Sequence, residues 1–69
     1  MADYRDLQGK TVRLTEERRS QAGPPIPAGT IGTATDRSNA GFRGLEWRFT
    51  APNGLYAWGV PGGVLELLG

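Results

Sequence analysis

The sequence predicts an all-β fold, a small barrel of five strands with one long loop between the first and second strands. Two stretches carry most of this prediction, an alternating strand over Lys10–Leu14 and a glycine-bounded strand over Thr30–Thr35. A compact apolar stretch at residues 64–68 supplies the last strand. The 69 residues fit one domain, in which we expect residues 1–8 to be a polar lead-in and residues 9–69 to form the barrel.

The first strand and the loop after it follow from polarity and from proline. Val12 and Leu14 share one face of the strand, because successive side chains point to opposite faces. Residues 15–29 then form the long loop, which the prolines in residues 24–27 (PPIP) stiffen. These residues also form a PxxP pattern, which could serve as a polyproline ligand. So short a pattern is common, and we interpret it as a stiffened loop.

The second strand does not alternate strictly. Its apolar residues Ile31 and Ala34 are three positions apart, so a regular strand would place them on opposite faces. A β-bulge or a positive φ at Gly32 would let both side chains face the core. We therefore predict an irregularity at Gly32.

The third and fourth strands show the clearest pattern. The third, Leu45–Thr50, alternates apolar and charged residues, and the turn Pro52-Asn53-Gly54 separates it from the fourth strand, Leu55–Val60. In the fourth strand, alternation places Tyr56, Trp58 and Val60 on the face opposite Leu55 and Ala57. The inward positions of the strands predict these core residues: Val12, Leu14, Ile31, Leu45, Phe49 and Leu67.

The composition excludes several kinds of chemistry. The chain has no histidine and no cysteine, which removes the usual base near neutral pH, thiolate nucleophiles and the commonest metal ligands. The seven carboxylates form no pair whose spacing suggests acid–base catalysis. We therefore expect no catalytic residue, no bound metal and no cofactor.

Charge and hydropathy point to a cytoplasmic protein without a membrane span. No apolar run approaches the roughly 20 residues that a spanning helix needs, and no secretory signal is evident. The net charge is only +1, whereas proteins that bind phosphate backbones usually carry a larger excess. Arg37, Arg43 and Arg48 nevertheless outnumber the acidic residues of the middle section, Asp36 and Glu46, so a local basic patch is expected there.

Aromatic and basic residues supply the strongest candidate binding site. They are Phe42, Arg43, Trp47, Arg48, Tyr56 and Trp58. If Trp47 fills the core, Trp58 and Tyr56 lie on the outer face, where Arg48 from the neighbouring strand can meet them. Exposed aromatics beside arginine anchor protein interfaces and also stack on bases. We assign partner binding to Trp58, Tyr56, Arg48, Arg43 and Phe42, while burial of both tryptophans in the core is the alternative.

The segment from Gly29 to Ala34 (GTIGTA) resembles the GxxGxV core of KOW-type and related SH3-like barrels, with Ala34 where valine is usual. Residues 9–14 look like the strand that opens these domains, and residues 45–68 look like their last three strands. The resemblance implies an SH3-like barrel and, through its KOW branch, RNA or DNA binding. Photosystem accessory barrels and plasmid-borne barrel dihydrofolate reductases share this fold. The resemblance therefore does not determine the function.

Three functions are consistent with these residues. The first is a non-enzymatic protein-binding adaptor or inhibitor, by analogy with small barrels among phage and mobile-element accessory proteins; its partner is a protein or a second copy of the chain. The second is a KOW-like RNA- or DNA-binding module. The third and least expected is an oligomeric pore enzyme like the barrel reductases, whose Val-Gln-Ile-Tyr segment is replaced here by residues 57–60 (AWGV) or 64–67 (VLEL).

Overall fold

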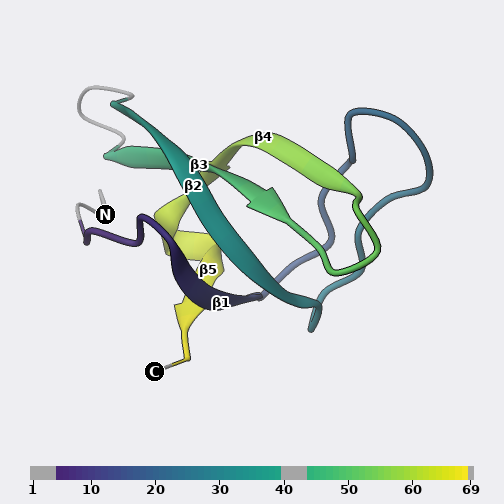
Figure 1. Ribbon diagram of the computed structural model, residues 1–69, viewed down its shortest axis with the longest axis horizontal. Helices are drawn as coiled ribbons and strands as arrows, with labels where there is room; N and C mark the ends of the chain where they lie inside the picture. Colours follow the sequence, from purple (N-terminus) through teal and green to yellow (C-terminus); the bar gives the residue numbers. More distant parts are fainter. Residues whose placement is uncertain (1–4, 40–43, 69) are drawn as a thin grey trace.

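Five strands form one antiparallel sheet in the computed structural model, which describes residues 5–39 and 44–68 (Figure 1). Neighbouring strands follow the order β4-β3-β2-β1-β5. The elements are β1 (Lys10–Leu14), β2 (Ile31–Asn39), β3 (Leu45–Thr50), β4 (Tyr56–Pro61), the 3₁₀ helix η2 (Gly62–Val64) and β5 (Leu65–Leu67). The predicted all-β class, the five strands and the long loop after β1 are confirmed. The sheet is not closed into a barrel, because β4 and β5 remain its two edges.

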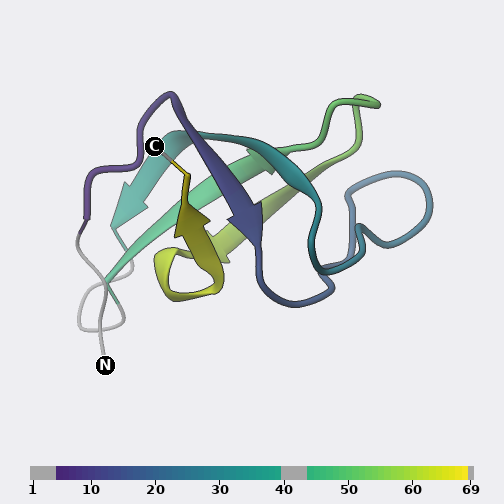
Figure 2. The same ribbon diagram turned by 90° about the horizontal axis from the view of Figure 1, so that it is seen from below.

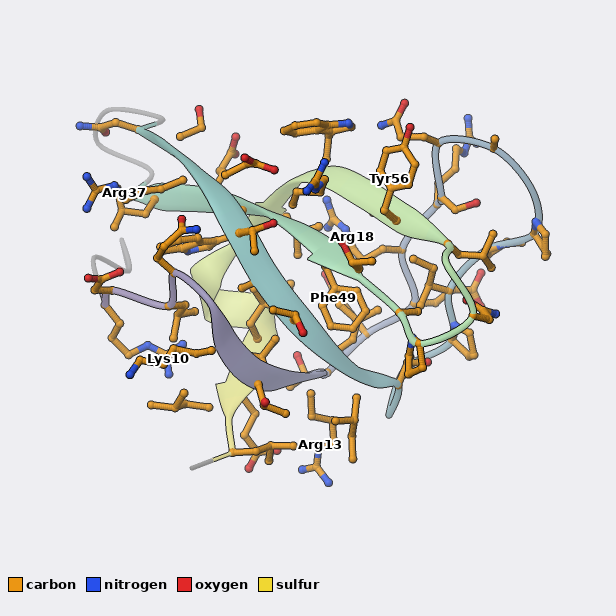
Figure 3. All side chains as sticks on the ribbon, in the orientation of Figure 1. Lys10, Arg13, Arg18, Arg37, Phe49 and Tyr56 are labelled. Carbon is orange, nitrogen blue, oxygen red and sulfur yellow. The ribbon has the colours of Figure 1, made fainter. Side chains whose placement is uncertain are left out.

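The core is one cluster of buried apolar side chains that the curled sheet encloses. Val12, Leu14 and Phe49 belong to it, as predicted, and Leu45 packs against it while partly exposed. Figure 3 shows Phe49 lying among the strands, in the interior of the molecule. The buried members are Leu7, Val12, Leu14, Ile26, Ala34, Trp47, Phe49, Ala51, Ala57, Val60 and Leu65.

In β2, the prediction that Ile31 is buried and the prediction of an irregularity at Gly32 are both wrong. Ile31 is 49% exposed, and the register of β2 against β1 is regular from Ile31 to Ala34, with no bulge and no positive φ at Gly32. Strict alternation therefore puts Gly32 and Ala34 on the inner face and Ile31 outside. The physical reason is space: a Cβ at Gly32 would lie only 2.8 Å from Cζ of Phe49. Small residues face inward here because the ring of Phe49 already fills this part of the core.

The prediction that Leu67 is buried is also wrong. Leu65, which pairs with Leu14, is the buried residue of β5, whereas Leu67 is 42% exposed. Since β5 is an edge strand, Leu67 has a neighbouring strand on one side only, where it pairs with Val12 of β1.

The long loop is a structured unit that projects from one end of the molecule in both views (Figures 1 and 2). At its base, Arg18 and Ile26 exchange two backbone hydrogen bonds, and the side chain of Ile26 is buried in the core. The Ser20 hydroxyl lies 3.1 Å from the carbonyl oxygen of Gly23 and 2.8 Å from that of Pro24. These contacts support the interpretation of the proline segment as a stiffened loop.

The segment before β1 also belongs to the folded body. Leu7 is fully buried, its carbonyl accepts the Lys10 N–H, and the Gly9 N–H donates to Ala34 of β2. The polar residues that surround Leu7 in the sequence therefore connect a core residue to the sheet.

Candidate site around Arg48

Two β-bulges flank Arg48, which lies on β3 between β2 and β4. Between the pairs Thr35–Arg48 and Ser38–Glu46, β2 has one residue more than β3, and Asp36 at this bulge has a φ of 55°. Between the pairs Trp47–Val60 and Phe49–Ala57, β4 likewise has one extra residue, at Trp58–Gly59. Bulges bend a strand and redirect its side chains. Here they bring Asp36 and Trp58 to Arg48 from its two neighbouring strands.

Arg48 is held on both sides by these neighbours. Its Nη2 lies 2.9 Å from Oδ2 of Asp36, and its guanidinium carbon lies 5.3 Å from the ring centroid of Trp58 and 6.0 Å from that of Tyr56. These are cation–π distances. The Nε of Arg48 is buried and has no hydrogen-bond partner among the described residues, so the inner part of the guanidinium is enclosed by the protein.

Tyr56 and Trp58 form the apolar part of the site, which we call the Arg48 face together with Arg48 and Asp36. Their ring centroids are 6.5 Å apart and the ring planes meet at 86°, the edge-to-face geometry of a favourable aromatic pair. Trp58 is 49% exposed and Trp47 only 1% exposed, so Trp58 is the tryptophan on the surface. The Arg48 face therefore presents two large rings to solvent in a fixed arrangement.

A groove runs along one side of the Arg48 face. It is lined by Trp58 and by residues 17–21 of the long loop. The Gln21 N–H donates to the carbonyl of Tyr56 at 2.9 Å, which fixes this part of the loop against the edge of β4. The groove therefore lies between this part of the loop and the ring of Trp58.

The structure brings three of the five predicted site residues together: Arg48, Tyr56 and Trp58. Phe42 and Arg43 lie outside the described residues. Figure 3 places Arg37 at the opposite end of the molecule from Tyr56, so Arg37 does not extend the basic patch to the Arg48 face. Arg18, which lines the groove, lies 3.5 Å from the carboxylate of Glu16. Arg48 and Arg18 are thus close to carboxylates, whereas Arg19, which also lines the groove, forms no ion pair with the described residues.

Sequence reasoning missed Asp36 and the loop residues of the groove. Alternation across the β3–β4 hairpin places Arg48 beside Tyr56 and Trp58, but Asp36 reaches Arg48 only because of the bulge in β2. The position of residues 17–21 depends on the long-range contact of Gln21 with Tyr56. After Thr35 the alternation along the strand is interrupted by two adjacent charged residues, Asp36 and Arg37. This interruption is the sequence signal that could have indicated the bulge.

Within residues 5–39 and 44–68, no three acidic side chains gather as a metal site would require, and no helix has the length and apolarity to cross a bilayer. Comparison with protein-family models, with curated proteins and with solved structures found no match. The geometry of the Arg48 face is therefore the basis for a functional proposal.

Proposed function

We propose that this chain is a non-enzymatic protein-binding module that docks on its partner through the Arg48 face. The observation that carries the proposal is Trp58, a half-exposed indole held in place by Arg48 and Tyr56. Tryptophan, tyrosine and arginine are the residues most enriched among interface hot spots. The Arg48 face combines all three.

The fixed geometry of the Arg48 face favours tight binding. Association normally costs about 0.5–1.5 kcal/mol for each flexible side chain that becomes immobile. The ion pair with Asp36 and the contacts with both rings hold Arg48 before a partner arrives. A partner therefore binds a surface on which the Arg48 side chain is already ordered, so less of this free-energy cost remains.

Electrostatics favour a protein partner over RNA or DNA. Binding to a phosphate backbone relies on cations that are free to replace counterions. Arg48 is paired with Asp36 and Arg18 is close to Glu16, which leaves Arg19 as the one groove arginine with no ion pair to the described residues. The net charge of the chain is only +1. The KOW-like nucleic-acid-binding function is kept as an outcome of the test, because both rings could stack on bases.

We also propose that the fold belongs to the SH3-like class. The support is the long loop after β1, the 3₁₀ helix η2 before the last strand, and the segment from Gly29 to Ala34. Binding a partner's surface as an adaptor or inhibitor fits such a domain, whereas the barrel reductases are distinguished by a segment that this chain lacks.

The test compares Trp58→Ala with Ile31→Ala. Ile31 is a matched control, because it is equally exposed and lies on β2, away from the two rings. Partners are captured from a lysate of the source organism, identified, and measured again as purified proteins. We expect Trp58→Ala to remain folded and to weaken binding about 30-fold, the equivalent of a hot spot of about 2 kcal/mol. Ile31→Ala should bind like the parent.

Two results would contradict the proposal. One is unchanged binding by Trp58→Ala, which would remove the Arg48 face from the interface. The other is capture that disappears after nuclease treatment and whose affinity falls steeply with salt, which would establish the nucleic-acid function instead.

A further inference from the structure

The turn between β3 and β4, at residues 51–55, contains an asparagine followed by a glycine. Asparagine is a chemically labile residue, because its side-chain amide can react with the backbone nitrogen of the residue after it. A side chain on that following residue hinders the reaction. Asn53 and Gly54 are both exposed, and a Cβ on Gly54 would have no atom within 4 Å apart from its chain neighbours. The approach to the Asn53 amide is therefore open.

The side chain of Asn53 is folded over the peptide bond that joins it to Gly54. Its Oδ1 accepts the backbone N–H of Leu55 at 3.0 Å, which is the hydrogen bond of an Asx turn. The ring of atoms that this hydrogen bond closes contains Cγ of Asn53 and the backbone nitrogen of Gly54, so the two reacting atoms lie within one tight turn. The Leu55 N–H also stabilises the negative charge that develops on Oδ1 when Cγ is attacked.

One hydrogen bond opposes the reaction. The Gly54 N–H donates to the carbonyl oxygen of Ala51 at 3.0 Å, and this bond must open before the nitrogen can lose its proton. A separate bond, from the Ala51 N–H to the carbonyl of Leu55 at 2.8 Å, closes the hairpin below the turn. Exposed turns open locally at a much lower free energy than the whole protein unfolds. The reaction therefore requires the opening of one turn and not the loss of the fold.

We propose that Asn53 is a self-modification site, at which the folded chain converts its asparagine to isoaspartate and aspartate. Hydroxide removes the proton of the Gly54 N–H, and the nitrogen attacks Cγ of Asn53. The N–Cγ bond forms, the Cγ–Nδ2 bond breaks, and Nδ2 takes a proton from water and leaves as ammonia. Water then hydrolyses the cyclic imide. Cleavage of its N–Cγ bond gives aspartate, and cleavage of its bond to the backbone carbonyl carbon of residue 53 gives isoaspartate.

Both products change the hairpin that carries the aromatic rings. Either product adds a negative charge, which lowers the formal net charge of the chain from +1 to zero. Isoaspartate also lengthens the main chain of the turn by one carbon atom. The pair Thr50–Tyr56 lies directly beyond this turn, so a longer turn displaces Tyr56 relative to Arg48. An effect on partner binding rests on the proposed function, whereas the modification itself does not.

The experiment follows the loss of ammonia from the intact folded protein at mildly alkaline pH. Ion exchange separates the charge forms, and peptide mapping with enzymatic methylation of isoaspartate locates the change. We expect a more acidic form with isoaspartate at residue 53, produced faster as the pH rises. Asn53→Ser should give no such form, because serine keeps an oxygen for the turn but has no amide to lose. Asn39, which Ala40 follows in the sequence, is the internal control and should keep its amide.

The purified isoaspartate form tests the effect on the rings. Near-ultraviolet circular dichroism reports on the edge-to-face pair of Tyr56 and Trp58. We expect this signal to fall in the isoaspartate form and to be retained in Asn53→Asp, which carries the new charge on a backbone of normal length.

An Asn53 amide that survives in the folded protein but is lost in urea would overturn the proposal, because the turn would then protect the asparagine. Equal loss at Asn39 would also overturn it, since the reaction would not depend on the following glycine. An unchanged ring signal in the isoaspartate form would show that the turn absorbs the extra carbon and would remove the effect on Tyr56. Isoaspartate that forms while partner binding is unchanged would uphold the modification and count against the proposed function.

Discussion

Gly32 occupies a position in β2 that has no room for a side chain. A Cβ there would lie 2.8 Å from the ring of Phe49 and nearer still to the backbone carbonyl oxygen of Thr50. The φ of Gly32 is not in the left-handed region, so glycine is required here for space and not for backbone conformation. The residue therefore marks how closely β2 packs over the third strand and its aromatic side chain.

We predict that Gly32→Ala lowers the free energy of unfolding by 1–3 kcal/mol, the usual cost of forcing extra atoms into a packed core. Gly63→Ala is the control, because no atom lies within 4 Å of a Cβ at Gly63. It should change stability by less than about 0.5 kcal/mol. Urea denaturation of both variants provides the measurement, and equal stabilities would show that β2 can move away from Phe49.

At the scale of elements, the bulges of β2 and β4 decide which side chains surround Arg48 of β3. Each adds one residue beside Arg48, and each contains a residue with positive φ, Asp36 in β2 and Gly59 in β4. The bulge in β4 directs Trp58 outward between the inward residues Ala57 and Val60, so the prediction that Val60 shares the outer face is wrong. The Arg48 face thus depends on irregularities in two strands as much as on its own side chains.

We predict that Gly59→Ala destabilises the protein by about 1–2 kcal/mol, because φ at Gly59 is +64° and a Cβ disfavours that conformation. Gly59→Asn should cost less, since asparagine adopts the left-handed region more readily. The atom nearest to a new Cβ, Oε1 of Glu46, is 3.8 Å away, so crowding does not explain the difference. Thermal unfolding of both variants tests this order, and an asparagine variant as unstable as the alanine variant would argue against the backbone explanation.

Much of this fold could be predicted from the sequence wherever apolar and polar residues alternate regularly along a strand. Residues 10–14 and 45–50 alternate clearly, and the Asn53–Gly54 turn sets the hairpin that places Tyr56 and Trp58 on the outer face. The prediction fails in β2 although this strand alternates regularly from Ile31 to Ala34, because a rule that assigns large apolar residues to the core points to Ile31 instead of Gly32. The inward role of glycine follows only from the ring of Phe49, which is distant in sequence. Pairings such as Asp36 with Arg48 are equally non-local.

At the scale of the whole molecule, an open sheet becomes a closed core because segments outside the strands cover it. Leu7 from the segment before β1 and Ile26 from the long loop are both buried with the sheet residues. The segment before β1 and the long loop, neither of which belongs to the sheet, thus complete the core. In so small a domain, each covering residue carries a large share of the net stability.

We predict that Leu7→Ala lowers stability by about 2–5 kcal/mol, the range for truncating a buried leucine. Gln8→Ala, a substitution at the exposed neighbouring residue, should stay within about 0.5 kcal/mol of the parent. Circular dichroism during urea titration measures both. A Leu7→Ala protein that unfolds at the same urea concentration as the parent would show that residues before β1 are dispensable for folding.

The position of β1 between β2 and β5 also determines when this chain can fold during its synthesis. Val12 of β1 pairs with Gly32 on one side and with Leu67 on the other, so its two partners follow it in the sequence by 20 and by 55 residues. Proteins dominated by such distant pairings fold on the order of milliseconds to seconds, which is short compared with translation at roughly 5–20 residues per second. The ribosome therefore holds an unfinished sheet until β5 emerges, and the core closes promptly afterwards.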